Sequence, residues 1–316
     1  MSDILYAVIP CYNEQEVLHE TAKRLHEKFL SLIETGTISA KSRIVFVNDG
    51  SKDSTWKIIC ELHAQNKIFS GINLSRNRGH QNALLAGLLT VKDCADMVIS
   101  MDADLQDDIN AIDAMIAEYH QNFDIVYGVR SKRETDTFFK RFTAESFYKL
   151  IKFLGGDIVN NHADYRLMSK RALDGLAQFG EVNLFLRGIV PMIGYPSTKV
   201  YYERAERFAG ESKYPLKKML FFALQGITSL TVEPIRMITA LGVLMSSVSF
   251  LVILWTLYEY FFGYTVRGWS SMLASLWFIG GLILLSIGVV GEYVGKIYLE
   301  TKNRPRFIVS EFLNEE

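Results

Sequence analysis

The chain has 316 residues, which allows one large domain or two smaller ones and a sizeable hydrophobic core. Its 34 basic and 35 acidic side chains nearly cancel but are unevenly spread: residues 1–129 hold 18 acidic against 11 basic side chains, and residues 130–236 hold 18 basic against 11 acidic. The three cysteines (Cys11, Cys60 and Cys94) lack the spacing of a metal site or of disulfide pairs, which indicates a reducing compartment.

Short apolar runs alternate with amphipathic stretches over the first 130 residues. This alternation predicts an α/β fold with a mostly parallel sheet and helices on both faces. The first run is too short for a signal peptide and ends at Pro10, so we expect this part to stay in the cytoplasm. No dinucleotide fingerprint or P-loop follows any run, which disfavours a Rossmann dehydrogenase and a P-loop NTPase. The predicted strands are 4–9, 43–47, 71–74, 97–101 and 124–128, and the predicted helices are 14–33, 54–65, 80–91 and 109–121.

Polar residues follow these strands where each one ends, which is where open α/β sheets bind ligands. The segments are P-C-Y-N-E at 10–14, N-D-G-S at 48–51, S-R-N-R-G-H at 75–80 and D-A-D-L-Q at 102–106. The carboxylates of the last segment are hard oxygen ligands, so they predict a divalent metal that holds a phosphorylated substrate.

Each of these segments also has a structural interpretation. Asn13 and Ser51 can cap the helices that follow them, and Gly50 and Gly79 can serve as turn residues. Asp49 can accept hydrogen bonds from a base or a ribose, while Gly50 permits close approach of another backbone. The joint appearance of four polar segments at one edge of a sheet favours a binding site.

The basic middle of the chain contains two segments that mix cations with apolar residues, 138–154 and 216–232. Each is typical either of a helix that lies in the headgroup plane of a membrane or of a core helix. Basic segments can also bind nucleic acid, but beside membrane spans they more often contact anionic lipid, so we expect no nucleic-acid partner.

Two long stretches without charge follow, and each can cross about 30 Å of hydrocarbon as a helix. They predict a hairpin of transmembrane helices at about 237–260 and 268–291, although buried core helices give the same pattern. Basic residues flank both outer ends, while the connection carries Arg267 alone, so the positive-inside rule places both termini in the cytoplasm. The flanking cations are Lys217, Lys218, Arg236, Lys296, Lys302, Arg304 and Arg306.

Together, these segments resemble glycosyltransferase family 2 and its GT-A fold. The D-A-D-L-Q form is similar to the dolichol-phosphate mannose synthase-like branch, and above all to the bacterial undecaprenyl-phosphate (bactoprenol) glucosyltransferases. Further matching motifs are G-V-R at 128–130, D-Y-R-L-M-S at 164–169, R-F-A-G-E-S-K-Y at 207–214 and G-E-Y-V-G-K-I-Y at 291–298. The resemblance implies a cytoplasmic GT-A catalytic domain at 1–215, an interfacial helix at 216–234, two membrane helices within 235–296 and a cytoplasmic tail at 297–316.

The resemblance also implies roles for individual residues. Asp104 would be the principal ligand of Mg²⁺ or Mn²⁺, helped by Asp102 and Gln106. Asp164 matches the position of the catalytic base, although we expect it mainly to orient the acceptor. Asp107 and Asp108 are interpreted as acids at a helix start. The donor would contact Pro10, Tyr12, Asn13, Glu14, Asp49, Ser51, Asp102, Ala103, Asp104, Arg207 and Lys213, and the acceptor phosphate would contact Arg130 and Arg141.

The implied reaction is metal-dependent, inverting transfer of a sugar from a nucleotide sugar to a polyprenyl phosphate in the plasma membrane. UDP-glucose is the expected donor, with UDP-N-acetylglucosamine and GDP-mannose as alternatives, and a homo-oligomer is expected by the same resemblance. Two other classes stay open. A processive polysaccharide synthase would carry a [QR]-x-x-R-W segment, and this chain has no Arg-Trp pair. A non-catalytic membrane scaffold would have no need for D-A-D-L-Q.

Overall fold

The computed structural model describes residues 2–131, 162–181, 185–203 and 269–314, together with scattered residues between 235 and 258. All nine elements predicted in the first 130 residues are present, with ends within four residues of the predicted ones. The strands are β1 (Leu5–Cys11), β2 (Arg43–Asn48), β3 (Phe69–Leu74), β4 (Met97–Ser100), β5 (Ile125–Arg130), β6 (His162–Ser169), β7 (Ser197–Tyr202) and β8 (Val309–Leu313). The helices are α1 (Leu18–Glu34), α2 (Thr55–Gln65), α3 (His80–Val91), α4 (Ala111–Tyr119), α6 (Lys170–Ala177), α7 (Leu186–Met192) and α10 (Trp269–Thr301).

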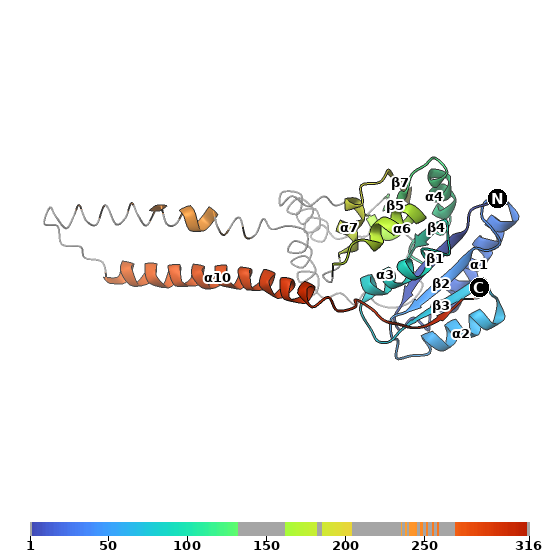
Figure 1. The fold of residues 1–316 in the computed structure, drawn as a ribbon, viewed down its shortest axis with the longest axis horizontal. Helices are drawn as coiled ribbons and strands as arrows, with labels where there is room; N and C mark the ends of the chain where they lie inside the picture. The colour runs from blue at the N-terminus through green and yellow to red at the C-terminus, as the bar shows by residue number, and fades with distance from the viewer. Residues whose placement is uncertain are drawn as a thin grey trace.

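The eight strands form one twisted sheet in the order β7-β5-β6-β4-β1-β2-β3-β8 (Figure 1). β1 pairs in parallel with β2 and β4, β2 with β3, and β5 with β7. β6 runs antiparallel between β4 and β5, and β8 runs antiparallel to β3. Six of the eight strands therefore run in one direction, as the sequence predicts, and the sheet is mixed because β6 and β8, which the apolar pattern did not predict, run against them.

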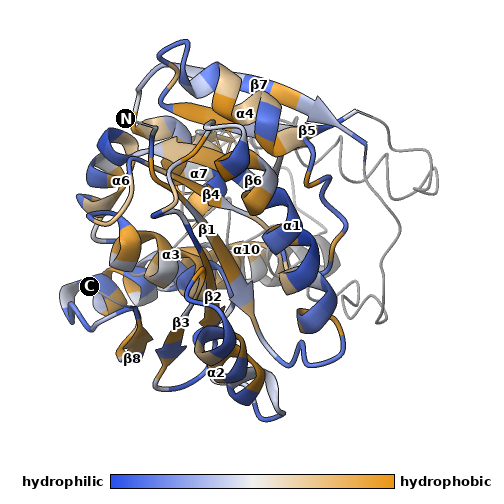
Figure 2. Ribbon diagram, turned by 90° about the vertical axis from the view of Figure 1, so that its right-hand side faces the viewer, coloured by the Kyte–Doolittle hydropathy of each residue, from blue (hydrophilic) through white to orange (hydrophobic). Residues whose placement is uncertain are grey.

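Helices cover both faces of the sheet, as the sequence predicts. Successive side chains of a strand point to opposite faces, so Leu5, Ala7 and Ile9 pack with α1, α2 and α4, while Tyr6 and Val8 pack with α3, α6 and α7. Figure 2 shows the apolar strands in the middle of the domain, with polar residues on the helices around them. Burial on both faces explains why these strands appear as apolar runs in the sequence.

Helix α10 projects away from the sheet (Figure 1). Its 33 residues extend over about 50 Å at 1.5 Å per residue. The segment Phe278–Thr301 has a mean hydropathy of 1.8, and none of its most apolar window is buried inside the protein. Within the described residues it is the one helix long and apolar enough to cross a membrane. The predicted hairpin is therefore seen in one arm only: most of 237–260 lies outside the described residues, as do the segments 138–154 and 216–232.

After α10 the chain returns to the sheet and adds β8 beside β3. Arg306 Nη1 donates to the carbonyl of Phe179 (2.9 Å), and the backbone NH of Ser75 donates to the carbonyl of Ile308 (3.0 Å). Ser310 Oγ donates to the carbonyl of Asn73, also at 2.9 Å. The stretch expected to be a tail thus contributes a strand to the central sheet and fixes the end of α10 to it.

Candidate active site

The turns that follow β1 and β2 are joined to each other by hydrogen bonds. The backbone NH of Asn13 donates to Ser51 Oγ (3.0 Å), and Asn13 Oδ1 accepts from the backbone NH of Lys52 (2.9 Å). Asn13 adopts a φ of 55°, which asparagine tolerates better than most residues. The helix-cap interpretation of Asn13 and Ser51 is wrong, because α1 and α2 start later, after Val17 and Ser54, and both polar side chains bond to the opposite turn.

Asp49 holds the loop that connects β3 to α3. Its buried carboxylate accepts from the backbone NH groups of Arg78 (2.6 Å) and Gly79 (2.9 Å). Burial raises the pKa of Asp49, although these two hydrogen bonds oppose the shift. Gly50 has a φ of 62°, and a Cβ at that position would lie 2.5 Å from the backbone nitrogen of Asn77. The close approach predicted at Gly50 therefore exists, and the approaching backbone is this loop.

The D-A-D-L-Q segment forms a constrained turn directly after β4. The hydroxyl of Thr21 in α1 donates to the carbonyl of Ala103 (2.8 Å), and the backbone NH of Gln106 donates to Asp104 Oδ1 (3.2 Å). Leu105 is buried with a φ of 57°, a conformation that costs a non-glycine residue about 1–3 kcal/mol. Such strain persists where the surrounding structure fixes it, so this turn is held in one shape.

Several acids crowd around the start of this turn. Loss of solvent around the carboxylate, together with nearby Asp107, Asp164 and Asp104, raises the pKa of Asp102 to about 6, although His80 opposes the shift. The side chain of Asp102 still has 34 % of its surface exposed. A bound cation would relieve this repulsion, which is a physical reason to expect one beside Asp102.

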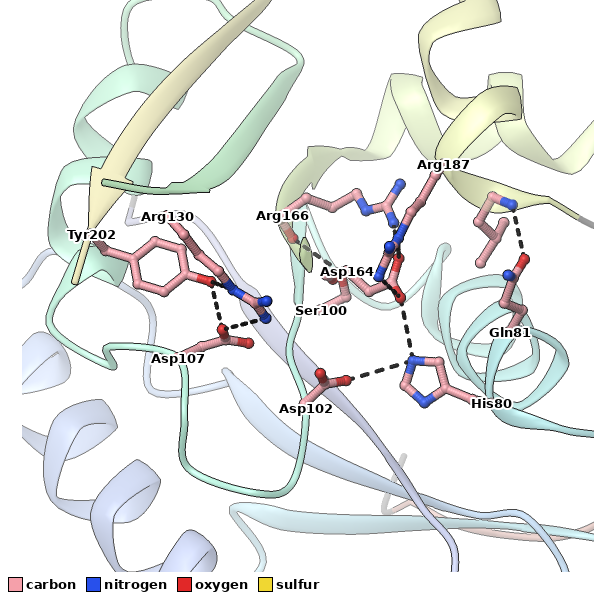
Figure 3. A network of polar contacts seen from close by, with 11 residues as sticks. His80, Gln81, Ser100, Asp102, Asp107, Arg130, Asp164, Arg166, Arg187 and Tyr202 are labelled. Atoms are coloured by element: carbon pink, nitrogen blue, oxygen red, sulfur yellow. Dashed lines mark hydrogen bonds and ion pairs between the residues drawn. The ribbon is translucent and has the colours of Figure 1, made fainter. Parts of the chain in front are cut away.

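His80, the first residue of α3, lies between the acid turn and β6. Its Nε2 atom is 3.5 Å from Asp102 Oδ1 and 3.4 Å from Asp164 Oδ2 (Figure 3). Asp164 also accepts from the fully buried Arg166 (Nη2, 2.7 Å) and from Arg187 of α7 (Nε and Nη2, each 3.3 Å). Burial alone would raise the pKa of Asp164, but Arg187, His80 and Arg166 outweigh it and hold that pKa well below its usual range.

A second cluster of polar side chains surrounds Asp107. The hydroxyl of Tyr202 on β7 donates to Asp107 Oδ1 (2.5 Å), and Arg130 Nη2 lies 3.6 Å from the same oxygen (Figure 3). Asp107 is 3 % exposed, so its interpretation as a helix-start acid is wrong. Asp108 lies in the turn that precedes α4, where its Oδ1 accepts from the backbone NH of Asn110, the residue before the helix. Burial and Asp107 raise the pKa of Tyr202, so its hydroxyl stays a donor.

The structure gathers most of the predicted site residues at one edge of the sheet. Three predicted residues, Arg141, Arg207 and Lys213, lie outside the described residues. The gathered residues are Pro10, Tyr12, Asn13, Glu14, Asp49 and Ser51 at the ends of β1 and β2, Asp102, Ala103, Asp104 and Gln106 after β4, Arg130 at the end of β5, and Asp164 on β6.

Four residues of this site were not predicted: His80, Arg166, Arg187 and Tyr202. His80 and Arg166 lie inside segments already recognised in the sequence, S-R-N-R-G-H and D-Y-R-L-M-S, so the sequence could have indicated them. Arg187 and Tyr202 come from α7 and β7, for which no motif was recognised.

The side chains present fit a metal that is shared with a substrate. Among the described residues no group of three or more His, Cys, Asp or Glu side chains converges as a complete ligand set. Mg²⁺ commonly takes one or two carboxylates, keeps several waters and completes its shell with substrate phosphates. Asp102 and Asp104 match that donor set, with Gln106 buried beside them.

Comparison with known proteins gives the same classification. The family described as Glycosyl transferase family 2 matches residues 6–176. The chain is 51% identical to the uncharacterized glycosyltransferase YkoT of Bacillus subtilis over 314 residues, 99% of this chain and 93% of that protein. It is 41% identical to the bactoprenol glucosyl transferase of Shigella phage SfX over 307 residues, 96% of this chain and 97% of that protein.

A solved structure of similar architecture is the mannosyltransferase PcManGT from Pyrobaculum calidifontis, in complex with GDP-Man and Mn²⁺. It has a TM-score of 0.46 and 15% sequence identity, over 96% of this chain and 87% of that one. The family match spans more than half of the chain, and the sequence relatives align along almost all of it. The chain therefore belongs to glycosyl transferase family 2 and is a glycosyltransferase.

Proposed function

We propose that the protein transfers glucose from UDP-glucose to the phosphate of undecaprenyl phosphate and so makes a lipid-linked monosaccharide for glycosylation of the cell envelope. The observation that carries this proposal is the juxtaposition of the acid turn after β4 with Asp164 and its arginines, Arg166 and Arg187. Relatives named bactoprenol glucosyl transferase, which align with 96% of this chain, support the lipid acceptor and the sugar. Helix α10 supports a reaction at a membrane.

On the donor side, Asp102 and Asp104 would hold Mg²⁺ or Mn²⁺ against the diphosphate, with Gln106 behind them. When bound, the metal would supply Lewis-acid stabilisation of the leaving diphosphate, a contribution of several kcal/mol. The joined turns after β1 and β2 would line the nucleoside pocket. Arg207 and Lys213 would close over the diphosphate.

On the acceptor side, the reaction hardly requires a catalytic base, because the acceptor has already lost its protons. A phosphate monoester has a second pKa near 6 and is largely a dianion at neutral pH. Its oxygen attacks the anomeric carbon as the bond from that carbon to the diphosphate oxygen breaks, which inverts an α-linked donor into a β-linked product. Asp164, whose pKa is held low by its cationic neighbours, would orient the acceptor rather than remove a proton. Arg130 and Arg141 would bind the acceptor phosphate through their guanidinium forks.

The lipid acceptor defines how the protein would sit in the cell. We propose that α10 and the predicted span at 237–260 form a hairpin in the plasma membrane with both termini in the cytoplasm, and that copies of the chain assemble through these helices. The catalytic site would then face the bilayer surface, where the phosphate of undecaprenyl phosphate lies.

The test is a transfer assay with purified full-length protein. Undecaprenyl phosphate is incubated with Mg²⁺ and UDP-glucose, UDP-N-acetylglucosamine or GDP-mannose, and the lipid product is identified by mass spectrometry. We expect a glucosyl lipid from UDP-glucose, which is lost on chelation, restored by Mg²⁺ or Mn²⁺, and abolished by Asp104→Asn. Asp113→Asn, which removes an exposed acid paired with Lys28 on α1, is the matched control. Failure to form a lipid product from any donor would refute the proposal.

A further inference from the structure

We propose that Arg187 binds the phosphate of the lipid acceptor. This role rests on the proposed function and adds a residue that lies outside all the motifs recognised in the sequence. Arg187 belongs to the first turn of α7, and its guanidinium reaches Asp164 beside that of the buried Arg166 (Figure 3).

The contacts between Arg187 and Asp164 are those of an outer, replaceable partner. Its Nε and Nη2 atoms lie 3.3 Å from the two oxygens of Asp164, longer than the 2.7–2.9 Å typical of charge-assisted hydrogen bonds. Its side chain is 39 % exposed, against 10 % for Asp164. A ligand can therefore reach the guanidinium without moving the core of the protein.

Asp164 has a second counter-charge besides Arg187. Arg166 is 1 % exposed and donates to Asp164 at 2.7 Å, so it supplies a permanent counter-charge that cannot leave. With a second guanidinium on the same carboxylate, the group of Asp164, Arg166 and Arg187 carries one positive charge in excess, beside the acids around Asp102. A phosphate dianion suits that excess, and its geometry matches the two parallel N–H donors of an arginine fork.

The position of Arg187 points to the acceptor rather than the donor. Gln81 Oε1 accepts from the backbone NH of Leu186 (3.0 Å), and the apolar residues of α7 are buried, so the backbone under Arg187 is fixed. Arg306, just after α10, bonds to the carbonyl of Phe179 in the connection that precedes α7. Helix α7 accordingly lies on the side of the domain from which α10 projects (Figure 1). A phosphate that arrives from the membrane meets Arg187 from that side.

The site also places this phosphate next to the donor. His80 Nε2 contacts both Asp102 on the donor side and Asp164 on the acceptor side, at 3.5 and 3.4 Å. A group bound by Arg187 beside Asp164 is therefore one side chain away from the carboxylates assigned to the diphosphate. That separation suits the transfer of a sugar from one phosphate to the other.

The test compares Arg187→Met and Arg187→Lys with a matched control, Arg171→Met. Arg171 makes the same two-atom contact with Asp124, at the start of β5 and away from the site. Initial rates are measured against undecaprenyl phosphate and against UDP-glucose. Donor binding is measured by calorimetry with UDP and Mg²⁺, and acceptor binding by the thermal stabilisation that undecaprenyl phosphate gives without donor.

We expect Arg187→Met to raise the KM for undecaprenyl phosphate by about tenfold or more and to abolish the stabilisation by this lipid. UDP binding should stay unchanged, Arg187→Lys should recover part of the loss, and Arg171→Met should behave as the wild type. If Arg187→Met does not fold, Arg187→Lys carries the test, with a severalfold rise in the acceptor KM.

Two results would overturn the inference. A fall in kcat with an unchanged acceptor KM would make Arg187 a positioning residue for Asp164, and weaker UDP binding would make it a donor ligand. The thermal measurement separates this inference from the proposed function. A wild type that is stabilised by undecaprenyl phosphate but forms no glucosyl lipid refutes the function, while the loss of stabilisation in Arg187→Met still supports the residue's role.

Discussion

Replacing Asp164 by asparagine tests whether the carboxylate mainly compensates buried charge. The substitution keeps the size of the side chain but leaves the guanidinium of Arg166 facing a neutral amide. Nε and Nη1 of Arg166 have no hydrogen-bond partner among the described residues, and Nη2 forms the ion pair with Asp164. If Asp164 served only as a catalytic base, Asp164→Asn would change the stability of the protein little.

The expected cost follows from burial. The side chains of Asp164 and Arg166 are 10 % and 1 % exposed, and removing one member of a buried ion pair costs about 3–5 kcal/mol. The contacts of Arg187 and His80 add little, because their side chains are 39 % and 40 % exposed and pairs of this kind contribute about 0–1 kcal/mol. For a domain of this size 1 kcal/mol corresponds to about 2–4 °C in Tm, so Asp164→Asn should lower Tm by at least about 6 °C.

The assay is thermal unfolding in detergent of the wild type, Asp164→Asn, and the double variant Asp164→Leu with Arg166→Met. The double variant should recover much of the loss, because an apolar pair replaces both charges. The native pKa of Asp164 lies below its unfolded value of about 3.9, so its contribution to stability is complete above that pH and disappears as the pH falls through the lower native pKa. The difference in Tm between wild type and Asp164→Asn should therefore become smaller as the pH is lowered into the acid range.

A Tm for Asp164→Asn within about 1 °C of the wild type at pH 7 would refute this reasoning. It would mean that Arg166 finds its counter-charge elsewhere. Loss of transfer with unchanged stability would return Asp164 to the role of a base.

Three further predictions concern the scaffold of the site. Gly50→Ala should lower Tm and weaken UDP binding, because the new Cβ would lie 2.5 Å from the backbone nitrogen of Asn77 and the alanine would also adopt a left-handed backbone conformation. Gly36 has a φ of 72° and nothing within 4 Å of an added Cβ, so Gly36→Ala should cost only the backbone strain of about 1–2 kcal/mol. Equal Tm losses would argue against the contact. Tyr202→Phe removes the hydrogen-bond donor to buried Asp107, so thermal unfolding should show a stability lower by about 1–3 kcal/mol. Transfer assays should show a higher acceptor KM, because Arg130 Nε also donates to the hydroxyl of Tyr202. Unchanged stability and KM would contradict a role of Tyr202 in the site. Deleting 307–316 removes β8 and should yield a less stable, aggregating protein in size-exclusion chromatography, and a monodisperse product with wild-type Tm would contradict this.

The elements that could be predicted from the sequence are those whose burial follows a simple period. β1 to β5 are apolar runs because helices cover both their faces, and the polar segments after them meet because neighbouring parallel strands end at one edge. The direction of β6 could not be predicted this way, since hydrophobic alternation is the same for parallel and antiparallel strands. β8 is a short edge strand in which exposed and half-buried residues mix, so it carries little apolar signal.

The same limit applies within the site. Asp102 and Asp104 could be assigned because their chemistry depends on residue type and short spacing. Asp107 could not, because its burial depends on Tyr202, which lies 95 residues further along the chain. Arg187 was missed for the same reason: a single arginine has no local pattern, and its contact with Asp164 arises only when α7 packs on the sheet.

The place of β8 at the far end of the chain also affects how the protein is made. A ribosome releases β3 long before β8, and the whole of α10 lies between them. Until residue 313 emerges, the backbone groups of β3 on that edge have no strand to pair with and are open to pairing with other chains. The sheet of this enzyme is therefore completed only after the whole of the apolar helix α10 has been synthesised.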